Sequence, residues 1–213
     1  MIKCDRSKPL HYFDDVVGQH FPSVSQILDT LYGDRFAYVK PDVLAEAQAR
    51  GTRRHLLFGV LVLRRAGLAP DPIIDPCDEA AARGLVKWIE THQVWPIQVE
   101  EPRVNEQYGY AGTPDLLCLY GRERKVLLVD LKTGIQDDAH KVQVQAYWRL
   151  MDYAGATVLM DLYVDDAGQV RESVVVPSPH DWSWFLSGLG VLKGRLARGV
   201  KGGWRYEVRE NQG

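Results

Sequence analysis

The segment between Thr113 and Lys132 constrains the fold more than any other part of this 213-residue chain. It contains two apolar stretches, Thr113–Tyr120 and Lys125–Leu131, separated by Gly121-Arg122-Glu123-Arg124. Apolar runs on either side of such a short polar stretch predict two strands joined by a tight hairpin. Because leucine and valine occupy both faces of these strands, we expect them at the centre of a covered sheet.

This hairpin predicts a pair of facing carboxylates. The turn pairs Tyr120 with Lys125, and counting back along both strands pairs Asp115 with Asp130. Directly opposed residues have Cβ atoms about 4.5–5.5 Å apart on one face of the sheet. Two opposed aspartates repel each other, and burial among apolar residues makes the repulsion worse. A divalent cation removes this cost, and Mg²⁺ is commonly held by one or two carboxylates, water and substrate phosphate.

Lys132 adds a positive charge to the same place. It lies two residues beyond Asp130 and therefore points to the same face. A lysine there can orient an attacking water or stabilise charge that develops on a phosphate. The alternative is two strand-end aspartates near a turn with a solvated lysine, since Asp-x-Lys alone is common. The combination with Pro114-Asp115 and the pairing favours a catalytic site.

The remaining sequence alternates between helical and extended patterns. Helices are predicted where apolar residues recur at helical spacing after a cap or a proline: after Ser23, from Pro41 and Asp42 to Arg64, and over 78–92, 139–153 and 180–198. Strands are predicted for residues 96–104, 156–164 and 169–176, and a small hairpin for residues 11–20. This order predicts a mixed α/β fold whose sheet begins as an antiparallel meander.

The length of the chain suits one domain spanning residues 1–213. We divide it into a mainly helical part (1–92), a catalytic sheet and helix (93–176), and a C-terminal helix with a basic tail (177–213). The tail is either a solvated helix face or a grip on DNA. Its basic residues are Lys193, Arg195, Arg198, Lys201, Arg205 and Arg209.

Composition narrows the possible partners and compartments. The net charge of −2 argues against coating nucleic acid through charge alone, but allows an enzyme that grips phosphates locally. Cys4, Cys77 and Cys118 lie far apart, which predicts reduced thiols rather than a zinc or iron–sulfur site. No apolar stretch suits a membrane span or a signal peptide. We therefore expect a cytoplasmic protein without a membrane partner.

Three motifs together resemble the PD-(D/E)XK nuclease superfamily: Gly112-Thr113-Pro114-Asp115, Val129-Asp130-Leu131-Lys132-Thr133-Gly134 and Gln143-Val144-Gln145-Ala146-Tyr147. The chain is most similar to the RecB-like branch, as found in compact phage and bacterial exonucleases. The resemblance extends upstream to Pro22-Ser23-Val24-Ser25-Gln26-Ile27-Leu28 and Arg50-Gly51-Thr52-Arg53-Arg54-His55. It implies a restriction-endonuclease-like core, in which helices flank a central mixed β-sheet, with an N-terminal helical segment.

The resemblance implies a role for each matched residue of the sheet. Asp115 and Asp130 would bind Mg²⁺ or Mn²⁺, with the Leu131 carbonyl as a third ligand. Lys132 would be the catalytic lysine. Glu100 matches the acidic position on the preceding strand, where it would serve metal binding and catalysis. Its neighbour Glu101 remains a competitor, because one sequence does not fix the register and only one of the two can face the metal.

The resemblance also implies that His55 completes the metal site. On a helix its neighbours one turn away are Gly51 and Gly59, which would let another backbone approach closely. The alternative is a histidine that is satisfied in the core or at the surface.

Gln143 and Tyr147 lie four residues apart on one helix face and would border the active site, near Lys132 or the DNA. The alternative is a half-buried tyrosine beside a surface amide. His140 shares this face and is a weaker candidate.

We therefore expect a metal-dependent DNA exonuclease of phage type, acting in recombination or DNA processing. Its partner would be DNA, with a recombination or single-strand-annealing protein as a further partner, in the bacterial host cytoplasm. Alternatives are an endonuclease or junction resolvase on the same core, or a non-catalytic DNA-binding accessory protein. The sequence has no phosphate-binding loop of a helicase motor and no cysteine cluster of the iron–sulfur nucleases.

Overall fold

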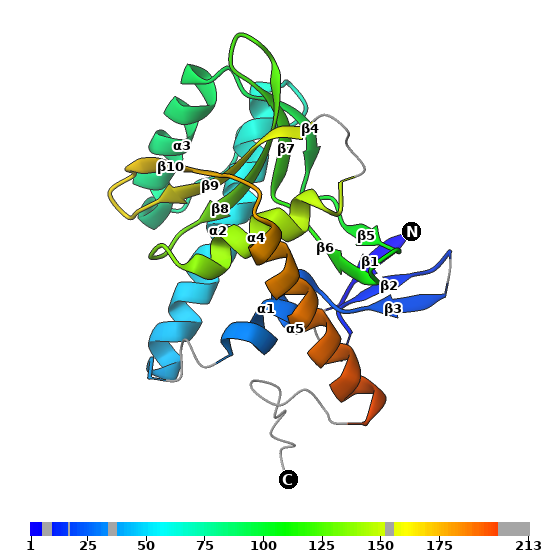
Figure 1. Ribbon diagram of the computed structural model, residues 1–213. Coiled ribbons are helices and arrows are strands. Elements are labelled where there is room, and N and C mark those ends of the chain that lie inside the picture. Colours follow the sequence, from blue (N-terminus) through cyan, green and yellow to red (C-terminus); the bar gives the residue numbers. More distant parts are fainter. Residues whose placement is uncertain (6–9, 17, 34–37, 152–155, 200–213) are drawn as a thin grey trace.

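A computed structural model of the chain describes residues 1–5, 10–16, 18–33, 38–151 and 156–199. Its centre is a five-stranded sheet in the order β10-β9-β8-β7-β4 (Figure 1). β8 and β9 are parallel and the other neighbours are antiparallel, so the sheet is mixed. Its strands are β4 (Trp95–Val99), β7 (Leu116–Tyr120), β8 (Lys125–Lys132), β9 (Ala156–Val164) and β10 (Val170–Val175). This α/β architecture is consistent with the expected restriction-endonuclease-like core.

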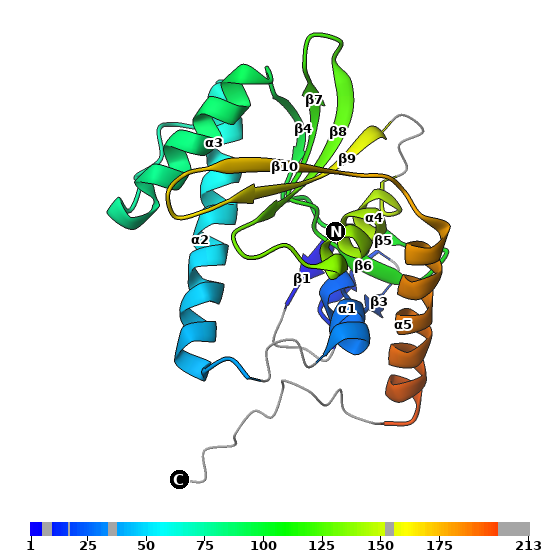
Figure 2. The same ribbon diagram turned by 60° about the vertical axis from the view of Figure 1, so that its left-hand side comes forward.

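Helices cover both faces of this sheet (Figures 1 and 2). Two helices pack on the face that carries Leu127, Val129 and Leu131: α2 (Pro41–Arg65) and α3 (Glu79–Thr91), which a short 3-10 turn, η1 (Pro76–Asp78), precedes. Three helices pack on the face that carries Leu117 and Leu128: α1 (Val24–Tyr32), α4 (Asp138–Trp148) and α5 (Pro179–Ala197). Burying one leucine side chain contributes about 1.5–3 kcal/mol, so the alternation along β8 fixes which face meets which layer.

The same alternation decides where the polar residues of β8 lie. Leu128 packs in the layer of α1, α4 and α5, so Asp130 and Lys132 point to that side as well. α4 lies against β8 and β9 on this face. Asp130 and Lys132 therefore lie between the sheet and α4, at the end of β8.

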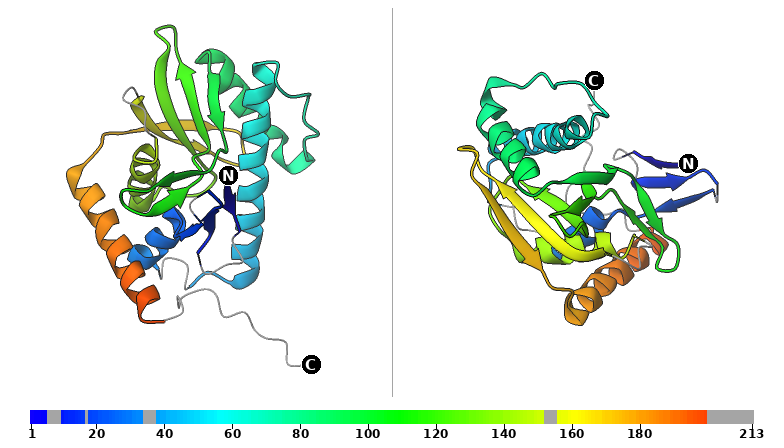
Figure 3. Two further views of the ribbon diagram at one scale, coloured as in Figure 1. Left: turned by 90° about the vertical axis from the view of Figure 1, so that its right-hand side faces the viewer. Right: turned by 90° about the horizontal axis from the view of Figure 1, so that it is seen from above.

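Two small sheets lie side by side next to the main one (Figures 1 and 3). One is antiparallel and consists of β1 (Ile2–Cys4), β2 (Tyr12–Asp14) and β3 (Gln19–Phe21). The other is the ribbon of β5 (Arg103–Asn105) and β6 (Tyr110–Gly112). Tyr12 and Phe21 pack against Ala111 between them. The hairpin predicted within residues 11–20 is β2–β3.

The single strand predicted for residues 96–104 is wrong. β4 ends at Val99, and Arg103 begins β5, which belongs to another sheet. Glu100 has a φ of 49°, a left-handed conformation that interrupts a strand, and Pro102 has no N–H to donate. The strand predicted from Thr113 also begins later, at Leu116.

The predicted helices are present with small shifts in their ends. Ser23 caps α1 in a capping box, in which its hydroxyl accepts from the Gln26 N–H at 3.0 Å and its own N–H donates to the Gln26 side chain at 2.9 Å. Pro41 occupies the first position of α2. α4 ends at Trp148, earlier than the predicted Tyr153, which lies outside the described residues.

Of the predicted basic tail, Lys193, Arg195 and Arg198 fall within the described residues, whereas Lys201, Arg205 and Arg209 lie outside them. Within the described ranges, every helix is too short or too polar to cross a membrane.

Candidate functional site

The β7–β8 hairpin has the register that was counted from the sequence. Tyr120 pairs with Lys125, and Leu116 pairs with Val129. Asp115 lies one residue before β7, so the regular ladder stops just short of the two aspartates.

Asp115 ties three strands together at this end of the sheet. Its Oδ2 accepts a hydrogen bond from the Leu131 N–H of β8 at 2.6 Å. Its main-chain carbonyl accepts one from the N–H of Glu100, directly after β4, at 3.0 Å. The side chain is 8% exposed, so these bonds hold it in a largely dry environment.

His55, Glu100 and Asp115 form a group of metal-ligand type. Each offers one ligand atom, and these atoms all lie within 4.8 Å of one another. The His55 Nδ1 is 3.0 Å from Oδ1 of Asp115, across a separation of 60 residues in the chain. The sheet and α2 thus bring together three of the residues that the resemblance selected.

Two features of α2 hold His55 in this position. A Cβ on Gly59 would lie 3.0 Å from Val99, so the glycine lets the helix approach the end of β4 closely. The second feature is Arg54, which directly precedes His55. Its guanidinium is fully buried and donates hydrogen bonds to Asp78 at 2.8 Å and to Asp166 at 2.7 Å. Arg54 therefore anchors α2 to η1 and to the β9–β10 turn.

The structure separates the two glutamates between which the sequence left the choice open. Glu100 belongs to the group with His55 and Asp115. Glu101 instead pairs with Arg103 at 3.3 Å, away from that group. The left-handed backbone of Glu100 costs about 1–2 kcal/mol in a residue with a side chain, and such strain often occurs at functional sites.

Lys132 begins a chain of polar contacts that leads to α4. Its Nζ lies 2.5 Å from Oδ2 of Asp130 and donates a hydrogen bond to Oε1 of Gln143 at 2.7 Å. The Gln143 amide in turn donates to the Tyr147 hydroxyl at 3.2 Å. Gly112 leaves room for this tyrosine, because a Cβ there would lie 2.7 Å from its ring. The motif on α4 thus reaches the lysine directly.

His140, the weaker candidate, lies elsewhere on α4. Its Nδ1 is 2.9 Å from the Tyr163 hydroxyl of β9. It has no place in the group around Asp115.

Burial and charge act in opposite directions on the ionisable groups. Burial lowers the pKa of His55, but the charge and hydrogen bond of Asp115 outweigh it, and the pKa rises to about 9. Burial raises the pKa of Asp115, but the His55 charge outweighs it and leaves the pKa below its usual value. Burial raises the pKa of Asp130 to about 7, with Lys132 opposing the rise and the Asp115 charge adding to it. When no cation is bound, the charge of Asp115 thus disfavours a second negative charge on Asp130.

This donor set fits a divalent cation. Carboxylate oxygens and water suit Mg²⁺ and Mn²⁺, and a neutral imidazole can complete the set. Asp130 is not part of the group of three among the described residues, and its carboxylate contacts Lys132. Its role as a ligand, and that of the Leu131 carbonyl, stay predictions.

Sequence reasoning missed Asp161. This aspartate lies in β9 directly opposite Asp130 in the parallel register and is 1% exposed. Burial raises its pKa to about 6. The available signal was an aspartate inside the apolar run Val158–Val164, but only the fold shows which strand lies beside it.

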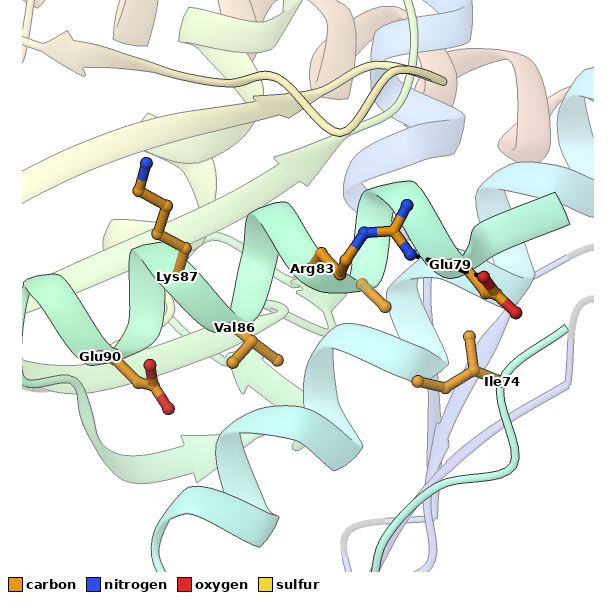
Figure 4. A pocket seen from close by; sticks show the side chains of 7 residues that line it. Ile74, Glu79, Arg83, Val86, Lys87 and Glu90 are labelled. Carbon is orange, nitrogen blue, oxygen red and sulfur yellow. Dashed lines mark hydrogen bonds and ion pairs between the residues drawn. The ribbon is translucent and has the colours of Figure 1, made fainter. Parts of the chain in front are cut away.

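Two hollows lie in different relations to the site. A cavity of about 470 Å³ adjoins the segment after Lys132, where Thr133, Arg50 and Arg171 are among its lining residues. A separate groove of about 370 Å³ runs along the outer side of α3, between Ile74 and residues such as Val86 and Lys87 (Figure 4). The groove contains no residue that the motifs selected, so of these two hollows the cavity is the one next to the site.

Comparisons with known proteins give structural similarity at low identity. No protein-family model and no curated protein matches the sequence. The crystal structure of SSO0001 aligns over 81% of this chain and 75% of its own, with 16% identity and a TM-score of 0.43. LHK-Exo in complex with dAMP aligns over 84% of this chain and 89% of its own, with 12% identity and a TM-score of 0.47. An alkaline exonuclease (LHK-Exo) structure from Laribacter hongkongensis aligns over 83% and 88%, with 11% identity and a TM-score of 0.45. These similarities concern the course of the chain and assign no role to any residue.

Metal binding should strengthen as the pH rises. Imidazole binds a metal only in its neutral form, and the His55 pKa of about 9 means that a cation must displace a proton below that pH. Between about pH 7 and about pH 9 we expect the affinity for Mg²⁺ or Mn²⁺ to rise about tenfold per pH unit, because one proton, that of His55, leaves per cation bound. Calorimetry in buffers of different ionisation enthalpy would count this proton.

Stability without metal should change in the opposite direction. The raised pKa of His55 means that its ion pair with Asp115 stabilises the fold fully below about pH 6.5 and is lost as the pH rises through about 9. His55→Gln, which cannot gain a proton in this range, is the control for both measurements. An affinity that stays constant from neutral to alkaline pH in the wild type would contradict the role of His55.

Proposed function

We propose that this protein is a divalent-metal-dependent deoxyribonuclease that hydrolyses phosphodiester bonds, and specifically a DNA exonuclease. The observation that carries the proposal is the group of His55, Glu100 and Asp115 beside the Asp130–Lys132 ion pair. One structural unit thus combines candidate ligands for a cation with a largely buried ammonium held by Asp130 and Gln143.

His55, Glu100 and Asp115 would hold Mg²⁺ or Mn²⁺, with Asp130 and the Leu131 carbonyl as further ligands. The cation would supply positive charge for the phosphate and lower the pKa of a bound water. The Leu131 N–H keeps the Asp115 carboxylate in a fixed direction, because the 2.6 Å hydrogen bond uses one of its two oxygens. This hydrogen bond therefore fixes the orientation of the Asp115 carboxylate before the ion binds.

Lys132 would act on the phosphate rather than on the metal. An ammonium has three donors and no lone pair, so it can orient a water molecule or stabilise negative charge but cannot ligate a cation. Gln143 fixes the ammonium from α4, and Tyr147 fixes the Gln143 amide in turn. We infer that the motif on α4 orients the catalytic lysine.

The cavity beside Thr133 supports DNA as the substrate. It gives a nucleotide room next to Thr133, the residue after Lys132. The Arg50 and Arg171 side chains in its wall, which also contains Asp165 and Asp166, offer guanidinium groups to a phosphate. We further propose a phage-type exonuclease that works in recombination or DNA processing in the bacterial cytoplasm, with a single-strand-annealing protein as its partner. An endonuclease or junction resolvase on the same core is the second reading.

End-labelled linear DNA and closed circular DNA, incubated with Mg²⁺, Mn²⁺ or a chelator, would test this function. An exonuclease releases mononucleotides from linear DNA and leaves the circle intact, whereas an endonuclease linearises the circle. Activity in the chelator would contradict metal dependence. A wild-type protein that binds DNA and cuts no linear, circular or branched substrate with either metal would instead be a non-catalytic accessory protein.

A further inference from the structure

Asp161 is a buried carboxylate that the proposed reaction does not yet use. It is 1% exposed, and its Oδ1 has no hydrogen-bond partner among the described residues. Leaving a buried polar group without a partner costs about 1–3 kcal/mol, and more when the group is charged. Asp161 therefore weakens the fold, and a role in stability does not explain its presence in an apolar strand.

The sheet places Asp161 at the lysine. The parallel register puts Asp161 opposite Asp130 and Tyr163 opposite Lys132, so Asp161 and Lys132 are diagonal neighbours on adjacent strands. Their side chains point to the same face, toward α4. Diagonal neighbours lie about 7–8 Å apart, a distance that a lysine side chain can span.

The contacts of Lys132 explain why a second carboxylate is needed. Its contact with Oδ2 of Asp130 is 2.5 Å long, but in the proposed function Asp130 also binds the cation. When the Asp130 carboxylate binds a divalent cation, it attracts the Lys132 ammonium less strongly. The Lys132 side chain is only 11% exposed, so water replaces a lost partner poorly, and a buried charge without a counter-charge is costly.

We propose that Asp161 is a positioning residue that acts through Lys132, by supplying its counter-charge when Asp130 binds the cation. Gln143 holds the ammonium from α4 at 2.7 Å, and Asp161 holds it from the side of β9. The inference rests on the proposed function and extends it, because it assigns a second carboxylate to the lysine and not to the metal.

Asp161→Asn tests this role, since it removes the charge and keeps the shape. We expect kcat for DNA cleavage to fall about 10- to 100-fold, the usual effect of removing a group that orients an active residue. KM and metal affinity, measured by calorimetry, should stay at the wild-type values, and the melting temperature should be equal or higher. Asp138→Asn is the matched control, because it removes an exposed acid from the start of α4 that pairs with Lys141 and not with Lys132.

Three results would overturn the proposal: an unchanged kcat, a metal affinity that falls with kcat and so makes Asp161 a ligand, or a loss of stability that accounts for the loss of rate.

A readout without cleavage is the double-mutant cycle of Lys132→Met and Asp161→Asn in urea unfolding. Coupling between the two residues should be larger in saturating Mg²⁺ than in chelator, and equal coupling or none would overturn the idea. A wild type that cuts no DNA would count against the proposed function, and the cycle would still decide the role of Asp161.

Discussion

Replacing Lys132 with alanine is expected to lower the single-turnover rate of DNA cleavage by about 10²–10³, the usual effect of removing one preorganised electrostatic donor. Metal affinity should change little, because the ammonium offers the cation no lone pair. The measurement is single-turnover cleavage of end-labelled DNA beside calorimetric metal binding, after circular dichroism confirms the fold.

Lys141→Ala is the control for this variant. Lys141 lies on α4 and pairs with Asp138 on the surface, so its loss removes the same charge from the protein but no contact of Lys132 or of the group around Asp115. Its rate should equal that of the wild type. Cleavage by Lys132→Ala at the wild-type rate would refute the catalytic role of the lysine. A loss of metal binding in that variant would refute the prediction that Lys132 acts on the phosphate and not on the metal.

Replacing Asp115 with alanine should have the larger effect, on binding and rate together. The residue offers one ligand atom, accepts the Leu131 hydrogen bond and orients His55, so its removal disturbs the whole group. Residues behind a metal ligand typically contribute 10- to 100-fold to affinity, and we therefore expect a loss of more than about 100-fold for the ligand itself. Calorimetry with Mg²⁺ and Mn²⁺ measures it, and cleavage at fixed metal should fall in parallel.

Glu100→Gln and Glu101→Gln provide a matched pair for this experiment. The two residues are adjacent in sequence and lose the same charge, but only Glu100 lies in the group with Asp115, while Glu101 pairs with Arg103. Metal affinity should fall for the first and stay unchanged for the second. If metal affinity fell for Glu101→Gln and stayed unchanged for Glu100→Gln, Glu101 and not Glu100 would be the metal ligand.

The parts of the site that could be predicted from sequence depend on local geometry. The pairing of Leu116 with Val129 follows from the length of the turn, because each residue of a hairpin fixes the next pair. The cap at Ser23 and the proline at the start of α2 are likewise decided by neighbours within one helical turn.

The parts that escaped prediction depend on contacts between distant segments. The break after β4 depends on the left-handed turn at Glu100, whose N–H bonds to Asp115 in another strand. The position of Asp161 beside Asp130 requires knowing that β9 follows α4 and returns parallel to β8. Pro102 indicates a break in the strand, and the strand–helix–strand order around α4 indicates a parallel crossover, but neither signal specifies the left-handed turn at Glu100 or the register of β9 on β8.

Arg54 controls the direction of a side chain that it never touches. Successive residues of an α-helix are rotated by about 100°, so His55 and Arg54 leave α2 on different sides of the helix axis. The bonds of Arg54 to Asp78 and Asp166 prevent the helix from turning about that axis, because a turn would leave a buried guanidinium unpaired. The imidazole is thus aimed at Asp115 by an ion pair that belongs to the framework of the fold. Changes at Asp78 or Asp166, outside the site itself, would therefore let α2 rotate and would loosen the alignment of His55 with Asp115.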